Sequence, residues 1–169
     1  MDYLLFLTNM QLMHQTTQLI ESVVMAYTTC METINDNTFL RGEPIAAMDV
    51  SLTQGILPGN KRDTNIDAIN TTHRPDRVSI GKGDTSTNPA FMPEFFTSDS
   101  IIYIIDSDIA TNKGFTPNND HPNNREYLAK KVPASMIKGI ITHDEHFEYV
   151  KTKVHDLGID IPVIKKSNI

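Results

Sequence analysis

Hydrophobic residues in this chain fall into short runs that are separated by polar residues, glycine and proline. The clearest run is the IIYII stretch at residues 101–105, a β-branched and aromatic segment between polar residues, which predicts a buried strand. Weaker runs of the same kind predict further short strands at residues 38–41, 77–80, 136–142 and 161–165. The core of the protein is therefore expected to contain a sheet of short strands.

In other segments the apolar residues recur every three or four positions, a spacing that is typical of amphipathic helices. Residues 11–34 are expected to form one helix or a pair, and residues 46–54 a short helix that ends at Gly55. Asn88 followed by Pro89 suits the start of another helix, which a second proline four residues further on keeps short or bent.

The order of these elements shows no regular strand–helix–strand alternation, so an α+β fold is expected rather than a doubly wound sheet. The length of 169 residues is that of one ordinary domain. Within it we expect an N-terminal helical segment, residues 1–37, and a core, residues 38–169. A long polar loop that is rich in asparagine is expected at residues 107–124.

Composition narrows the classes of partner. Hydrophobic residues make up 39% of the chain and charged residues 21%, which is enough apolar material for a packed core. The net charge of −6 argues against a nucleic-acid partner, because binding a duplex needs a concentrated lysine and arginine surface. A small cleft for an anionic cofactor is still compatible with this charge, since a single arginine can hold a pyrophosphate.

The N-terminal apolar run, residues 1–7, is too short for a membrane span and has no basic residues before it, as a signal peptide would. No other segment is long and apolar enough to cross a bilayer. The protein is expected to be soluble, or to be delivered by a route that leaves no such signal. The single cysteine, Cys30, excludes an intrachain disulfide and is interpreted as a buried thiol.

Two motifs carry candidate chemistry. Residues 38–60, TFLRGEPIAAMDVSLTQGILPGN, combine a strand with Arg41 near its end, a proline-containing turn, a short helix and a glycine loop. Residues 124–142, NREYLAKKVPASMIKGIIT, place Glu126 before a Tyr-Leu-Ala triplet, basic residues, a Val-Pro step and a strand. In this order, the two motifs resemble the catalytic subunits of cholera and pertussis toxins, which are mono-ADP-ribosyltransferases.

The resemblance covers residues 38–142 and implies two small β-sheets packed at a steep angle around an NAD cleft, with helices on the flanks. It implies that Glu126 is the catalytic carboxylate, since a fixed carboxylate stabilises the positive charge that develops on the ribose when nicotinamide leaves. It also implies that Arg41 supports the NAD pocket, where a guanidinium offers a rigid fork to phosphate or to backbone carbonyls.

Between these motifs the family has a Ser-Thr-Ser strand end, whose hydroxyl positions the catalytic glutamate. Ser79 falls at the first of these positions, whereas Ile80 and Gly81 depart from the pattern. A rival placement uses the Asp-Thr-Ser sequence at residues 84–86. The resemblance further implies that His73 lines the cleft, because pertussis-type enzymes keep a histidine in this part of the chain.

The acceptor is indicated by the residue two positions before the glutamate. Arginine-modifying members of the family have a second glutamate there, but this chain has Asn124, an amide that cannot act as a base. The resemblance therefore implies a toxin or secreted effector that cleaves NAD and transfers ADP-ribose to a protein side chain other than a standard arginine. Its target would belong to a host or competitor cell. The alternatives are an NAD glycohydrolase and an inactive binding module, the latter suggested by the altered middle motif.

Two clusters that contain acidic residues are further candidate sites. The histidines and acids at residues 143–148 lack the helical His-Glu-x-x-His spacing, so a solvated turn is expected there and no metal site. Asp106 and Asp108 share one face only if the preceding strand continues through them.

Overall fold

The structure is a computed structural model that describes Met13 and residues 34–58, 76–120 and 125–169. The chain divides into two units, Met1–Thr33 and Ile34–Ile169, and every element discussed below belongs to the second. The helix or helix pair expected at 11–34 lies outside the described residues except for Met13 and Ile34, so it stays a prediction.

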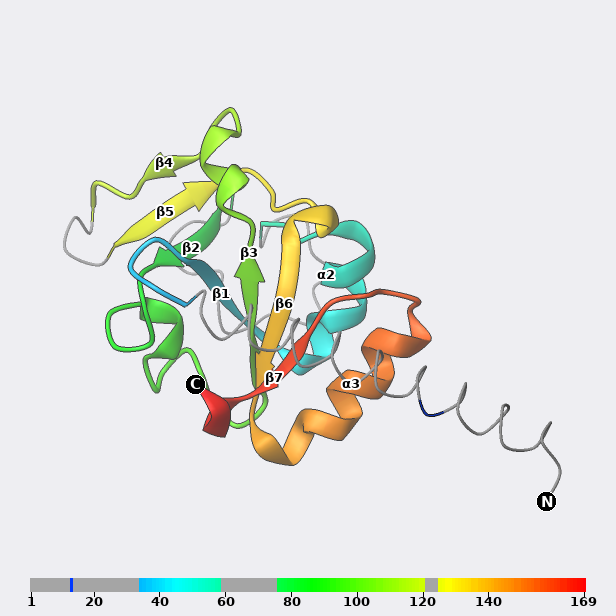
Figure 1. The fold of residues 1–169 in the computed structure, drawn as a ribbon. Coiled ribbons are helices and arrows are strands. Elements are labelled where there is room, and N and C mark those ends of the chain that lie inside the picture. Colours follow the sequence, from blue (N-terminus) through cyan, green and yellow to red (C-terminus); the bar gives the residue numbers. More distant parts are fainter. Residues whose placement is uncertain (1–12, 14–33, 59–75, 121–124) are drawn as a thin grey trace, which may run out of the picture. The chain divides into compact units, whose positions relative to one another are not determined.

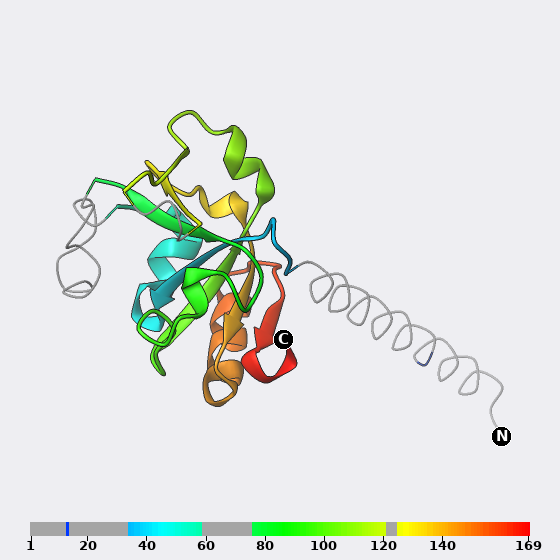
Figure 2. The ribbon, with the colours of Figure 1, turned by 90° about the vertical axis from the view of Figure 1, so that its left-hand side faces the viewer.

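Seven strands of the second unit form one sheet, in the order β4-β5-β2-β1-β3-β6-β7. Their bounds are β1 Phe39–Pro44, β2 Val78–Lys82, β3 Ser100–Ile105, β4 Thr116–Pro117, β5 Glu126–Ala129, β6 Ile137–Thr142 and β7 Val163–Lys165. Neighbouring strands are antiparallel, except that β6 and β7 are parallel. Figures 1 and 2 show the two edges of the sheet, β4 with β5 at one end and β7 at the other.

The two perpendicular sheets that the resemblance implied are not seen among the described strands, because backbone pairing joins all of them into one sheet. The sheet is strongly twisted, however, and Figure 1 shows β4 and β5 running steeply across the direction of β3 and β6. Accumulated twist between neighbouring strands turns the two ends of a sheet away from each other in this way. The α+β expectation agrees with the mixture of strands and short helices.

The predicted strands are present, with changes of extent. β2 runs to Lys82, two residues beyond the expected 77–80, and β7 begins at Val163 rather than at residue 161. β1 was expected to end at Arg41, but it continues through Gly42 and Glu43 to Pro44, which pairs with Ser100 of β3. The proline stands at the last position of the strand, where its missing N–H does not interrupt the ladder. The glycine and proline were interpreted as the end of the strand, which was wrong.

The main hydrophobic cluster lies on one face of the sheet and includes side chains of two α-helices of the described part of the chain. Helix α2 (Met48–Gln54) contributes Met48 and Leu52, and helix α3 (Phe147–Asp156) contributes Val150 and Val154. These side chains pack against alternate strand residues such as Tyr103, which is fully buried. Helix α2 ends as expected at Gly55, whose φ of 88° suits a residue without a Cβ.

Helix α3 was not predicted from the sequence. The turn expected at residues 143–148 contains only one 3-10 turn, Asp144–His146, after which α3 begins at Phe147. The expected helix at Asn88 is also shorter than a full α-helix, being one 3-10 turn, Pro89–Phe91. Its start is as predicted, because the Asn88 side chain accepts a hydrogen bond from Ala90 N.

The polar loop expected at residues 107–124 contains more structure than its composition indicates. It begins with a 3-10 helix, Ser107–Thr111, and contains the short strand β4, which pairs with β5. Its residues 121–124 lie outside the described part of the chain. Within the described part, no helix is long and apolar enough to cross a membrane.

Candidate active site

Glu126 begins strand β5, and two side chains donate hydrogen bonds to its carboxylate. The hydroxyl of Ser79, on the neighbouring strand β2, donates a hydrogen bond to Oε1. The side-chain amide of Asn118 donates to Oε2 over 2.7 Å. The contact with Ser79 follows from the strand register, because Glu126 lies opposite Gly81 and residues two apart on β2 share a face. The carboxylate is therefore held at both oxygens.

This carboxylate lies in a cleft with an empty volume of about 590 Å³, which includes the solvent at its mouth. The polar residues of the cleft come from three adjacent strands and are Arg41 of β1, Ser79 of β2 and Glu126 of β5. Apolar side chains supply much of the remaining lining, and Met92 and Phe95 are 40% and 47% exposed. A cleft with a mostly apolar lining and a few convergent polar groups is the usual form of a small-molecule site.

Arg41 connects the cleft to a buried acidic group. Its Nη1 donates to the backbone oxygen of Ser79 over 3.2 Å, and its Nε lies 3.5 Å from Oε1 of Glu43. The Glu43 side chain has no exposed surface, and its Oε2 accepts a hydrogen bond of 2.7 Å from the hydroxyl of Ser51 in α2. A buried carboxylate needs such partners, because an uncompensated charge there would be strongly destabilising. The guanidinium is thereby fixed between β1 and β2.

Two glycines allow the apolar wall of the cleft to approach the sheet. A Cβ on Gly42 would lie 3.1 Å from the backbone oxygen of Phe95, and a Cβ on Gly81 would lie 2.2 Å from Oδ1 of Asn88. Asn88 is buried, and its Nδ2 donates to Gly83 O. The glycine that departs from the family's Ser-Thr-Ser pattern is therefore required here by the packing of Asn88. The other departing residue, Ile80, is fully buried in the core.

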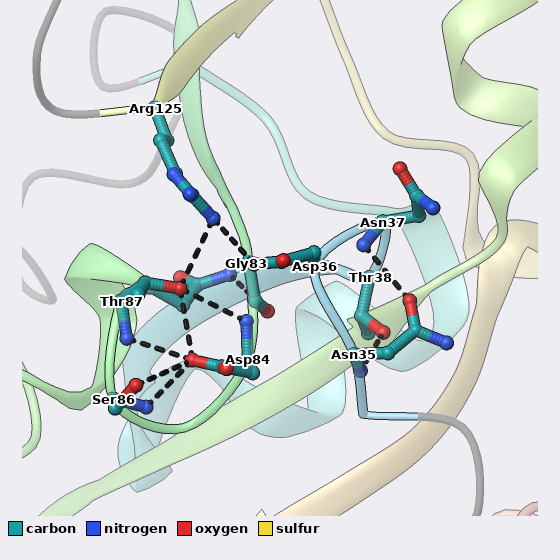
Figure 3. Close-up of polar contacts among 10 residues, drawn as sticks. Asn35, Asp36, Asn37, Thr38, Gly83, Asp84, Ser86, Thr87 and Arg125 are labelled. Atoms are coloured by element: carbon teal, nitrogen blue, oxygen red, sulfur yellow. Dashed lines mark hydrogen bonds and ion pairs between the residues drawn. The ribbon is translucent and has the colours of Figure 1, made fainter.

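The rival placement of the middle motif forms a turn of its own. The Asp84 carboxylate accepts hydrogen bonds from the backbone N–H and hydroxyl groups of Ser86 and Thr87, at 2.8 to 2.9 Å (Figure 3). These bonds, first of all the one from the Ser86 hydroxyl, lower the pKa of Asp84 below its ordinary value. Ser79 contacts the carboxylate of Glu126 directly, whereas the Asp84 carboxylate accepts hydrogen bonds within its own turn.

The same turn holds the residue that precedes Glu126. Arg125 has a φ of 48°, and it is the only residue other than glycine with a positive φ among the described residues. Its Nη1 lies 2.6 Å from Oδ1 of Asp36 and donates to Oγ1 of Thr87 over 3.2 Å (Figure 3). Its backbone oxygen accepts a hydrogen bond from Lys82 N. A left-handed conformation at a side-chain-bearing residue persists where its surroundings determine it, as they do here.

Two of the expected site residues, His73 and Asn124, lie outside the described residues, so their roles stay predictions. Asp106 caps the 3-10 turn after β3 by accepting a hydrogen bond from Asp108 N, so the two acids do not share a strand face. Among the described residues, no group of three histidine, cysteine or acidic side chains is placed to hold a metal ion.

Asn118 is the site residue that sequence reasoning missed. It lies in the asparagine-rich loop, directly before an exposed second asparagine, and no pattern in the sequence distinguishes the two. Only the pairing of β4 with β5, which brings Pro117 opposite Tyr127, places Asn118 beside Glu126.

Comparison with known proteins supports a class of fold. No protein-family model matches the chain, and no curated protein matches it by sequence. The structure is similar to that of Thermosipho africanus DarTG in complex with ADP-ribose, with a TM-score of 0.52 and 12% sequence identity. The match covers 76% of this chain and 50% of that chain, so this chain spans about half the length of the DarTG structure. The likeness supports an ADP-ribosyltransferase-like fold, and at this identity it carries the fold alone. The narrower type, that of cholera and pertussis toxins, rests on the sequence resemblance.

Proposed function

We propose that this protein is a mono-ADP-ribosyltransferase that binds NAD in the cleft, releases nicotinamide and transfers ADP-ribose to an acceptor. The observation that carries the proposal is the convergence of Arg41, Ser79 and Glu126 on one cleft, from three strands that are far apart in sequence. These are the residues that the resemblance to cholera and pertussis toxins singles out. The ADP-ribosyltransferase-like fold adds independent support.

In the proposed reaction the bond between the ribose C1′ and the nicotinamide nitrogen breaks, and its electron pair leaves with nicotinamide, which becomes neutral. Positive charge builds on the ribose, and Glu126 stabilises it electrostatically through the 2′-hydroxyl side. A nucleophile of the acceptor then bonds to C1′ and gives up its proton. Because Ser79 and Asn118 already hold the carboxylate, little reorganisation is needed as the charge develops.

The first prediction concerns Glu126 itself. Glu126→Gln keeps the shape of the side chain but removes its charge, so nicotinamide release from NAD should fall by about 100- to 1,000-fold. Release is measured by chromatography, with Glu148→Gln, an exposed glutamate on α3, as the matched control. Equal rates for wild type and Glu126→Gln would remove Glu126 from the chemistry. Saturable NAD binding with no release by wild type would instead favour an inactive binding module.

The acceptor is proposed to be a protein side chain other than a standard arginine, because Asn124 replaces the second glutamate of arginine-modifying enzymes. We extend the proposal to a toxin or secreted effector whose target belongs to a host or competitor cell. Incubation with labelled NAD and cell lysate, followed by mass spectrometry of labelled peptides, identifies the acceptor. Nicotinamide release without any labelled product would point to an NAD glycohydrolase.

A further inference from the structure

Asn118 binds Glu126 at two points. Its side-chain Nδ2 donates to Oε2 of the carboxylate over 2.7 Å, and its backbone N–H donates to the backbone oxygen of Glu126 over 2.8 Å. The second contact extends the pairing of β4 with β5 by one residue. The residue that holds the carboxylate is therefore fixed to the same strand that carries it.

The orientation of the amide is determined by a third contact. Oδ1 of Asn118 accepts a hydrogen bond of 3.2 Å from the backbone N–H of Asp120. Because this donor needs the oxygen on its side, the NH₂ group must face Glu126, where a carboxylate oxygen needs a donor. Both ends of the amide are thus satisfied, as expected of a side chain that is only 5% exposed.

The two hydrogen-bond donors to Glu126 bind different oxygens of its carboxylate. Ser79 binds Oε1 from β2, and Asn118 binds Oε2 from the loop after β4. One donor alone would leave the carboxylate free to rotate about its last bond, whereas two donors on different oxygens fix its plane. Asn118 is not among the described residues that line the cleft, and it reaches the cleft through its contact with Glu126.

We propose that Asn118 is a positioning residue, which holds the Glu126 carboxylate in the plane that the reaction needs. The inference rests on the proposed function for its effect on rate, but the contact itself does not depend on activity. It assigns a role to a residue of the asparagine-rich loop that no sequence motif identified.

Asn118→Asp is the variant that separates positioning from a structural role. Aspartate keeps the oxygen that accepts from Asp120 N–H, and it keeps the backbone bond to Glu126. It replaces the donor with a second acidic oxygen that faces the carboxylate. A residue that only shapes the turn would tolerate this change, whereas a positioning residue would not.

The expected result is a fall in kcat for nicotinamide release of about 10- to 100-fold, with KM for NAD changed much less, because small displacements of a catalytic group cost this much. Asn119→Asp, at the exposed neighbouring asparagine, adds the same charge and should leave both constants unchanged. Asn118→Ser, whose hydroxyl can cap the turn but is too short to reach Oε2, should also lower kcat, and it serves if Asn118→Asp does not fold. Wild-type kcat in folded Asn118→Asp overturns the inference.

A second readout distinguishes failure of this inference from failure of the proposed function. In the ¹⁵N-labelled protein, the side-chain NH₂ resonances of Asn118 should shift and exchange faster in Glu126→Ala, which removes the acceptor. If wild type releases no nicotinamide but these resonances respond, the proposed function fails and the carboxylate contact stands. If the resonances do not respond to Glu126→Ala, the positioning contact is absent and the inference is wrong.

Discussion

The half of the sheet that contains β3 and β6 and the half that contains β5 are stabilised by different interactions. All six residues of β3 are buried, and its partner β6 has one exposed residue, so this half is stabilised by packed aliphatic side chains. In β5 the first two residues are partly exposed, and the start of the strand is held by polar contacts through Arg125, Ser79 and Asn118. The difference teaches that stability is concentrated in the β3–β6 half, while the candidate site is built where the sheet is least apolar.

The largest effect on stability is expected in the apolar half. Ile140 of β6 is fully buried in the core, so Ile140→Ala should lower the free energy of unfolding by about 2–5 kcal/mol, through lost burial and the cavity that remains. Chemical denaturation measures the loss, and Ile140→Val, which removes one methyl group, should cost only about 0.5–1.5 kcal/mol. Below the melting temperature, nicotinamide release per folded molecule should be unchanged. A fall in that rate would show that the two halves are coupled.

An intermediate effect is expected at Glu43, where the two halves meet. Glu43→Gln removes the buried charge beside Arg41 but retains an oxygen for the Ser51 hydroxyl. The free energy of unfolding should fall by about 1–3 kcal/mol, and nicotinamide release should also fall because the guanidinium loses its partner. Ser51→Ala is the control, since it leaves the ion pair in place. Loss of stability with full activity would remove Arg41 from the site.

The smallest effect is expected at Asp106, just beyond β3. The Asp108 N–H and the nearby Lys138 lower the pKa of Asp106 below its ordinary value. A lowered pKa in the folded state stabilises the fold above the ordinary value, and this contribution disappears as the pH falls through the folded-state value. Asp106→Ala should therefore cost no more than about 1 kcal/mol near neutral pH. In denaturation curves at about pH 2 the difference should be smaller; an undiminished difference would contradict the assigned cause.

The sequence predicted those elements whose structure is determined by the burial of their own neighbouring residues. The IIYII run made β3 evident, because every residue of that strand is buried. Helix α3 was missed because it buries only Val150 and Val154, and its many charged residues resemble a solvated turn. The extension of β1 to Pro44 was missed because it depends on pairing with β3, which local propensity does not report.

In the candidate site, too, some residues could be predicted from the sequence and others could not. Ser79 and Glu126 could be expected from their motifs, and the structure joins them by a hydrogen bond. Asn118 could not be expected, because its position depends on strand pairing and on the conformation of a loop. Gly81 could be noted as a departure from the family pattern, but only the structure shows that Asn88 occupies the space that a side chain would need.

The placement of the candidate site on three adjacent strands has a consequence for how its relatives can be found. Arg41 and Ser79 are 38 residues apart, and Ser79 and Glu126 are 47 apart, so the segments between them can change in length and composition while hydrogen-bonded strands preserve the arrangement. Divergence of this kind lowers the overall sequence identity to an undetectable level long before it alters the arrangement of the three site residues. A search for homologues in genomes is therefore best made with a three-point template of arginine, serine and glutamate on neighbouring strands, rather than with an alignment score.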